Sequence, residues 1–443
     1  MLRLMKIISR FALCFLCLIP LAARAELKID IVAGNAEPVA IAIAEFDSAK
    51  ADAKAAAEIR KVVESDLKSS GLFHIIDAAA HPEKPEFDLM PDFAKWNAVK
   101  AKVLVQSKLT RAEGKKLRLQ FYVWDVGGKE QVEAESLTAP KESSRRLGHI
   151  MADTIYKRLT GEGGYFDSQI VITAQTGTMT SPKKRLAVMD SDGANFRYIS
   201  DSKTYVLTPY FSPNMQSIIF LSYKGDDPGV WILDMNTGEQ RRLGKFEGMN
   251  FAPRWSPDGE KIAFSLVGNY GESNLYEYDI ATKKMRQLTK TRDINTSPSY
   301  SPDGQKMAYN SNESGSQQLH VMDLKTLKSQ RISYGDGRYA TPAWSPDGKY
   351  IAFTKIADDT FFIGVMSPEG KRERILAGGW YMESPSWAPN SRRLIYYETE
   401  KINDGYERQS AIRSVDILGH FNYEIYIPEG VNGQDPTWSP LLP

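Results

Sequence analysis

Cysteine is almost missing from this sequence: its only two copies, Cys14 and Cys17, lie in an apolar stretch near the N-terminus. If that stretch is removed, the remaining chain has no thiol, which excludes disulfide bonds, thiol catalysis and cysteine-bound metals. Histidine is also scarce, and no two copies have the spacing of a metal-binding pair; they are His74, His81, His149, His320 and His420. We therefore expect no metal and no cofactor.

The absence of a hydrolase motif and of excess charge argues against two further classes of function. The sequence has no Gly-x-Ser-x-Gly pentapeptide, which a prolyl-oligopeptidase-type hydrolase domain would need for its nucleophile. It also has no excess charge, because 56 Lys and Arg face 55 Asp and Glu over 443 residues. A balanced chain offers no general attraction to nucleic acid or to anionic lipid. We expect neither as a partner, and the length suggests two or three domains.

The N-terminus has the pattern of a secretory signal peptide. Arg3, Lys6 and Arg10 precede the apolar run Phe11 to Leu21, and Ala23-Arg-Ala25 follows as a small-residue cleavage site. An uncleaved membrane anchor is the alternative, but this run has only about half of the roughly 20 residues that cross a bilayer. We predict that residues 1–25 are removed and that the mature, exported protein begins at Glu26.

Residues 26–160 predict a separate α/β domain. Leu27 to Val32 alternates as a strand, and residues 53–70 and 144–159 carry apolar stripes at helical spacing. Between these helices we expect a short strand at residues 73–76, a helix at 92–99 and three strands at 102–109, 117–126 and 131–137. Because Gly161-Glu-Gly-Gly164 follows the last helix, we interpret residues 161–167 as a hinge.

From residue 168 to 443 one pattern recurs six times, an X-Pro pair followed by an aromatic residue and Ser-Pro or Ala-Pro. The second proline falls at positions 213, 257, 302, 346, 389 and 440. A period near 44 residues is the size of a four-stranded propeller blade, so the fold class is a two-domain chain with an α/β domain and a six-bladed β-propeller. The segment from Ser168 lacks the Trp-Ser-Pro strand, so we expect Pro436 to Pro440 to complete its blade and close the ring.

Other features of the repeats have simple structural interpretations. Asp190-Ser-Asp-Gly193 begins like a calcium loop, but it lacks the terminal glutamate ligand and occupies a hairpin-turn position of the repeat. Trp255, Trp344, Trp387 and Trp438 recur at one blade position, which favours core packing over a carbohydrate-stacking surface. The loops leading into each X-Pro strand should surround one mouth of the channel. Their small polar residues suit docking of a protein loop better than acid-base catalysis.

The export signal, the domain order, the six repeats and the ending Pro436-Thr-Trp-Ser-Pro440 together resemble the TolB family, periplasmic components of the Tol-Pal system. The resemblance covers essentially the whole chain. It implies a non-enzymatic monomer that supports outer-membrane integrity and constriction during cell division. The implied partners are the peptidoglycan-associated lipoprotein Pal, the inner-membrane protein TolA and other outer-membrane proteins, with no small-molecule substrate.

The resemblance also implies two sets of site residues. The Pal site at the mouth corresponds to Met249, Asn250, Phe251, Ala252, Asn295, Thr296, Ser297 and Thr341. Met249 stands where the family often has a histidine. The TolA-binding tail, which is expected to switch between packing against the domains and release, corresponds to Glu26, Leu27, Lys28, Ile29, Asp30, Ile31, Val32, Ala33, Gly34, Asn35, Ala36 and Glu37.

Two alternatives remain open at this stage. One is a propeller enzyme of the peptidase or lactonase type, which would need acids or histidines clustered at the mouth. The other is an exported propeller that binds a protein outside any Tol machinery.

Overall fold

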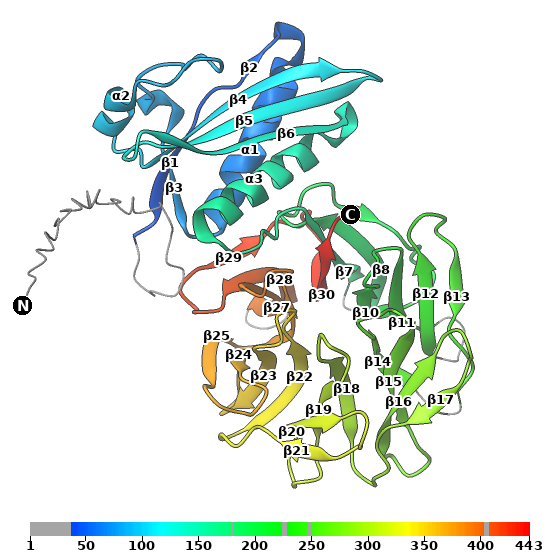
Figure 1. The fold of residues 1–443 in the computed structure, drawn as a ribbon. Helices are drawn as coiled ribbons and strands as arrows, with labels where there is room; N and C mark the ends of the chain where they lie inside the picture. Colours follow the sequence, from blue (N-terminus) through cyan, green and yellow to red (C-terminus); the bar gives the residue numbers. More distant parts are fainter. Residues whose placement is uncertain (1–36, 179, 224–227, 247, 249, 403–406) are drawn as a thin grey trace, which may run out of the picture.

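The computed structural model describes residues 37–178, 180–223, 228–246, 248, 250–402 and 407–443. It has an N-terminal α/β domain and a ring of six sheets, as the sequence predicted (Figure 1). The expected signal peptide, the tail up to Ala36 and Met249 lie outside the described residues. In the part that is described, no helix is long and apolar enough to cross a bilayer.

The N-terminal domain is built on a mixed sheet with the strand order β3-β1-β4-β5-β6. Its strands are β1 (Val39–Ile43), β2 (Asp47–Ser48), β3 (Phe73–Ile75), β4 (Val103–Ala112), β5 (Lys116–Asp125) and β6 (Glu130–Pro140). β1 pairs in parallel with β3 and β4, and the long strands β4, β5 and β6 form an antiparallel meander. Every predicted strand of residues 38–140 is therefore present, with small differences at the ends.

Two helices, α1 (Ala53–Ser69) and α3 (Ser144–Thr160), cover one face of this sheet. Alternate residues of β1 and β4 divide between the faces: Ile41 and Val103 join the helices, whereas Leu104 packs with the short helix α2 (Phe93–Ala98). α3 ends at Gly161, whose φ of 76° is the left-handed conformation that glycine adopts without steric cost.

The propeller consists of six four-stranded sheets. Blades 1 to 5 are consecutive along the chain, with strand orders β10-β11-β12-β13, β14-β15-β16-β17, β18-β19-β20-β21, β22-β23-β24-β25 and β26-β27-β28-β29. Their strands are β10 (Val206–Phe211), β11 (Ser217–Ser222), β12 (Gly229–Asp234), β13 (Gln240–Arg242), β14 (Asn250–Trp255), β15 (Lys261–Val267), β16 (Ser273–Asp279), β17 (Met285–Gln287), β18 (Asn295–Tyr300), β19 (Lys306–Ser311), β20 (Gln318–Asp323), β21 (Ser329–Arg331), β22 (Arg338–Trp344), β23 (Ile351–Ala357), β24 (Thr360–Met366), β25 (Arg374–Gly379), β26 (Met382–Trp387), β27 (Arg393–Ile402), β28 (Glu407–Asp416) and β29 (Asn422–Ile425).

Blade 6 combines strands from both ends of the propeller segment, as predicted. β30 (Asn432–Leu441) pairs with β7 (Ser168–Thr178), followed by β8 (Ser181–Asp190) and β9 (Arg197–Tyr198). Trp438 lies opposite Ile170, and its indole nitrogen donates a hydrogen bond to Ser168 Oγ at 2.8 Å. The ring is therefore closed by antiparallel strand pairing.

The Ser-Pro-Asp-Gly turn explains why the first and second strands of a blade meet so sharply. In blade 2, Asp258 Oδ1 accepts hydrogen bonds from Ser256 Oγ and from the Glu260 amide, and the Gly259 amide donates to the Ser256 carbonyl at 2.9 Å. Gly259 has a φ of 73°, so the turn uses the conformational freedom of glycine. The same contacts recur around Asp303 and Asp347.

Antiparallel order gives the propeller two distinct faces. The Ser-Pro-Asp-Gly turns and the turns between third and fourth strands lie on one face, here called the domain-side face because the chain enters it from α3. The starts of the innermost strands and the hairpins between second and third strands lie on the other, here called the mouth face. On the mouth face, the hairpins β7–β8 and β27–β28 have strands of 10 or 11 residues, whereas the corresponding strands of blades 1 to 4 have 6 or 7.

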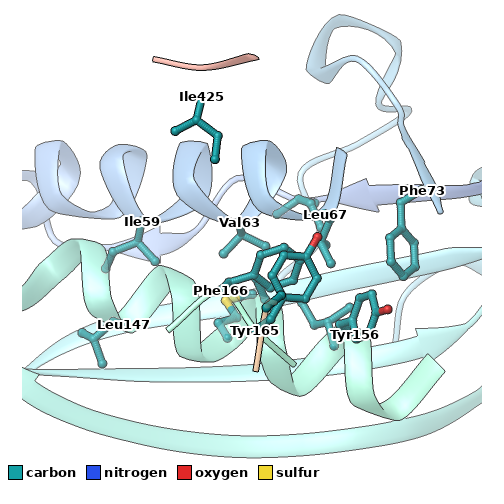
Figure 2. Close-up of a cluster of buried hydrophobic side chains, with 14 of the residues drawn as sticks. Ile59, Val63, Leu67, Phe73, Leu147, Tyr156, Tyr165, Phe166 and Ile425 are labelled. Atoms are coloured by element: carbon teal, nitrogen blue, oxygen red, sulfur yellow. The ribbon is translucent and has the colours of Figure 1, made fainter. Parts of the chain in front are cut away.

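The two domains share a hydrophobic core (Figure 2). Ile59, Val63 and Leu67 of α1 and Tyr156 of α3 belong to the same buried cluster as Ile425 of β29. Tyr165 and Phe166, from the predicted hinge, are 2% and 1% exposed within it, and Tyr165 packs edge-on against Trp438 at 5.7 Å. Residues 161–167 thus connect the domains through a packed region.

Candidate functional site

A ring of strained residues surrounds the central channel. In each innermost strand the residue before the first proline has a positive φ, between 45° and 58°, although none of the six is glycine. At each position two residues oppose one on the neighbouring strand, which is a β-bulge. The six residues are Thr208, Ala252, Ser297, Thr341, Ser384 and Asp435. A left-handed conformation costs about 1–2 kcal/mol for a residue with a side chain.

Asp435 joins neighbouring blades within this ring. Its carboxylate accepts a hydrogen bond from the Thr208 amide at 3.1 Å and another from Ser384 Oγ at 3.3 Å. At this level the channel holds a cavity of only about 20 Å³, beside Arg254 and Tyr210. The Arg254 guanidinium lies 3.8 Å from the Tyr210 ring centroid and donates to the Pro253 carbonyl. One water fills such a space.

The residues predicted to bind Pal have different environments. Ala252, Ser297 and Thr341 belong to the strained ring. Thr341 Oγ1 lies 2.7 Å from Thr354 Oγ1 of the same blade, and Thr296 Oγ1 accepts from Ser265 Oγ of the preceding blade, so both hydroxyls already have partners within the propeller.

Asn295 is buried, and its amide nitrogen donates to the Ser273 carbonyl and to Thr291 Oγ1. The side chain thus holds the start of β18 in place. Asn250 and Phe251 pair through their backbones with Leu266 and Ser265 of β15.

Sequence reasoning missed the aromatic and aliphatic side chains exposed on the mouth face. Tyr270, in the hairpin between β15 and β16, is 96% exposed, and Tyr334, between β21 and β22, is 68% exposed. Further large hydrophobic residues are exposed in the loops of blades 1, 3 and 5: Tyr205, Tyr223, Ile294 and Trp380. An exposed aromatic in a polar loop, as in Gly268-Asn-Tyr-Gly271, is the sequence signal that could have found them.

A charged cluster connects the two domains on the domain-side face. His149 of α3 is 3% exposed, and its Nδ1 lies 2.7 Å from Asp66 Oδ2 of α1. Arg145, also of α3, donates to Asp190 and Asp192 of the propeller at 3.4 and 2.5 Å. His149, Asp190 and Asp192 have ligand atoms within 4.8 Å of one another, but Arg145 already provides a positive charge there. The arrangement is that of an ion cluster between domains.

The cluster holds a proton more tightly than its separate groups would. Burial alone lowers the pKa of His149, but the Asp66 and Asp190 carboxylates outweigh burial and raise that pKa to about 10. Burial also raises the pKa of Asp66, against the effect of the facing imidazolium. Both directions mean that the folded protein keeps this proton at a pH where the unfolded chain has released it.

Arg393 is a second polar link between the domains. It is 2% exposed, and its guanidinium donates to Ser414 Oγ at 3.0 Å and to the Phe421 carbonyl at 3.1 Å. Its Nη1 reaches the carbonyl of Ser70, immediately after α1, at 3.5 Å. The loop after α3 adds an ion pair between Glu162 and Arg392. These contacts join the N-terminal domain to blades 5 and 6 on the domain-side face.

Comparisons with known proteins match both domains. Residues 27–132 match the family model of the TolB amino-terminal domain, and residues 156–442 match that of the TolB beta propeller domain. The chain is 46% identical over 440 residues to the Tol-Pal system protein TolB of two Rickettsia bellii strains, OSU 85-389 and RML369-C. The alignment covers 97% of this chain and 98% of each relative.

A solved structure has the same fold. The crystal structure of TolB from Acinetobacter baumannii superposes with a TM-score of 0.81 at 24% identity, covering 91% of this chain and 97% of that one. With two family models and a full-length relative in agreement, the chain belongs to the TolB family of Tol-Pal system proteins.

Proposed function

We propose that this protein is a non-enzymatic periplasmic scaffold of the Tol-Pal system. In this proposal the lipoprotein Pal docks on the mouth face, TolA binds the segment 26–37, and the complex supports outer-membrane integrity and constriction during division. Other outer-membrane proteins are further candidate partners. The protein is exported with removal of residues 1–25 and needs no cofactor.

The observation that carries the proposal is the gathering of exposed aromatic side chains on the mouth face. Tyrosine and tryptophan are enriched among the residues that dominate protein interfaces, because their large rings combine apolar area with a polar group. Tyr270 and Tyr334 project from two different blades of this face. The cavity enclosed by the strained-ring residues is only about 20 Å³, far below the volume of a substrate pocket, which favours docking over catalysis at that level.

The position at which the tail joins the fold supports its role as a switch. The Val39 amide, at the start of β1, donates to the Leu72 carbonyl, and the neighbouring Gly71 lies against Phe421 of the propeller. Residues 26–37 are therefore attached close to the junction of the domains. A partner that takes hold of this segment acts next to the contacts that fix the two domains together.

Calorimetry with a soluble Pal domain tests the proposal. We expect saturable binding to the mature chain beginning at Glu26, and altered affinity for a version beginning at Pro38. Tyr270→Ala should weaken binding by about tenfold, as hot-spot truncations do. The matched control is Leu327→Ala, which removes an exposed side chain from a domain-side turn and should leave binding unchanged.

Each outcome separates one part of the proposal from another. Equal binding by the two chain lengths would keep Pal as a partner and remove the switch. No binding by either would remove the Pal assignment. An equal loss in Tyr270→Ala and Leu327→Ala would mean that the mouth face is not the docking surface.

A further inference from the structure

A large groove lies on the mouth face between the two long hairpins. The hairpin β7–β8 and the hairpin β27–β28 form its walls, and the start of β30 lies between them. Its volume is about 1050 Å³, which is above the roughly 300–1000 Å³ of pockets for small molecules. We call it the inter-hairpin groove and define it by Gln175, Trp380, Tyr397, Gln409, Asn432 and Gln434.

The part of the lining that the structure describes is polar and nearly uncharged. Four side-chain amides reach it, from β7, β28 and β30, and each amide can both donate and accept hydrogen bonds. Threonine and serine hydroxyls add further neutral partners, including Thr399 and Ser410. Among the described residues of the lining, Glu429 is the only acidic one and none is basic, although Lys184 donates to the Gln434 side chain at 2.8 Å. Such a surface favours an uncharged ligand that is rich in hydroxyl or amide groups.

Aromatic rings form the blade 5 side of the groove. Trp380 is 38% exposed, and its ring centroid lies 6.2 Å from that of Tyr381. Tyr381 in turn packs against Tyr397 at 5.9 Å and against Phe361 at 4.7 Å. Tyr397 is 7% exposed and belongs to the buried cluster shared by the two domains, Tyr381 packs against that cluster, and Trp380 is the exposed ring of the three.

A buried carboxylate holds two of these rings in place. Tyr381 Oη donates to Glu383 Oε2 at 2.9 Å, and Tyr397 Oη donates to the same oxygen at 3.2 Å. Burial raises the pKa of Glu383, and the two phenol donors work against that rise. A shared acceptor fixes the rotation of both rings, so the aromatic side of the groove is ordered before any ligand arrives.

We propose that the inter-hairpin groove binds a neutral oligosaccharide. The C–H faces of sugar rings stack on exposed aromatic rings such as Trp380, while their hydroxyl and acetamido groups pair with amide side chains on the opposite wall. The volume holds more than one sugar unit. In an exported protein, the class of ligand with this chemistry is a glycan of the cell envelope.

A peptide is the competing occupant, and backbone pairing excludes it only along part of the walls. β7 pairs on both sides up to Gln175 and β27 up to Glu398, so the hairpin ends beyond these residues keep an open edge. An added peptide strand would need an unpaired edge to bind by extending a sheet. Sugar recognition needs no such edge.

The test is a titration of the mature chain with chitotetraose and cellotetraose, followed by tryptophan fluorescence and by calorimetry. We expect saturable binding of at least one tetrasaccharide at about 1 mM or tighter. Trp380→Ala should weaken it by about tenfold and Gln409→Ala by about threefold. Tyr270→Ala is the matched control, since it removes an exposed ring of blade 2 from the same face and should not change sugar affinity.

Several results would overturn the proposal. A lack of binding by both tetrasaccharides at up to about 10 mM would overturn it, because a site with a Kd near 1 mM would be saturated at that concentration. Equal affinity of the Trp380→Ala chain would also do so, as would capture of a peptide by the groove without sugar binding. The Pal titration is independent: a chain that binds Pal and no sugar contradicts only the groove proposal, and the reverse contradicts only the docking proposal.

Discussion

The two faces of the propeller are built from the same repeat, yet their chemistry is opposite. At blades 5 and 6 the domain-side face is covered by the N-terminal domain, through a shared core, the cluster around His149 and Arg393. The mouth face carries exposed rings such as Tyr270 and hairpins of unequal length. The Ser-Pro-Asp-Gly turns keep one face uniform, because their internal hydrogen bonds fix the chain. The hairpins between second and third strands are not built on this turn, so hairpin length differs from blade to blade on the mouth face.

Removing the buried imidazole of His149 should have the largest effect on the stability of the contact between the two domains. His149→Leu leaves the Asp66 carboxylate buried without its partner, and such a loss costs about 3–5 kcal/mol. We expect a large fall in the thermal midpoint of unfolding. The control replaces both partners by leucine, because an apolar pair leaves no unpaired charge and should recover much of the loss. A double variant as unstable as His149→Leu would contradict this explanation.

The same cluster should make stability depend on alkaline pH. The pKa of His149 rises from an ordinary 6.5 to about 10 on folding, so its contribution is complete below pH 6.5 and is lost as the pH rises toward 10. Arg145, Asp190 and Asp192 are, with Asp66, the other charged groups next to this ring. Thermal unfolding between pH 6.5 and 10 measures the effect. The slope should be smaller in the double leucine variant, and an unchanged slope would assign it to other groups.

Changes on the mouth face should affect binding without affecting stability. Joint replacement of Tyr270 and Tyr334 by alanine should leave the free energy of unfolding within about 0.5 kcal/mol, because both rings are largely exposed. Affinity for the soluble Pal domain should fall by at least about tenfold. Urea unfolding and calorimetry on one preparation compare the two effects. A destabilised double variant would mean that these rings support the fold.

The smallest effect is expected in the strained ring. Ala252 has a φ of 52°, so Ala252→Gly removes a conformational cost of about 1–2 kcal/mol and adds about 0.5–1 kcal/mol of chain entropy. We expect a gain of up to about 1 kcal/mol in the free energy of unfolding. Ala252→Val should lower it by a similar amount, because a branched side chain tolerates this conformation poorly. Equal stabilities of the two variants would show that the bulge carries no strain.

Most of the fold followed from the sequence, because period and turn chemistry are local. The strand between the turns needs only alternating apolar residues, and the missing strand of the Ser168 blade identified Trp438 as its partner. The bulges were not predictable in this way. A residue before proline ordinarily adopts an extended conformation, whereas Thr208 and its five equivalents have positive φ because two residues must oppose one on the next strand.

The candidate site was less accessible to sequence reasoning, because exposure and burial are set by tertiary packing. Asn295 was expected at the mouth, and its side chain is buried in contact with Thr291. The sequence spacing gave His149 no metal-binding partner among the histidines, and only the docking of α3 against Asp190 reveals its charged neighbours. All the predicted partner-binding residues stay predictions, and of these Met249 and the tail up to Ala36 lie outside the described residues.

The pairing of β30 with β7 sets an order of events during synthesis. The Gln169 amide donates to Ser439 Oγ across 270 residues of chain, so blade 6 cannot form until almost the whole propeller has emerged. Until then β7 presents an unpaired edge that other extended chains can join. A chaperone that covers this edge should therefore matter most in the interval before β30 arrives.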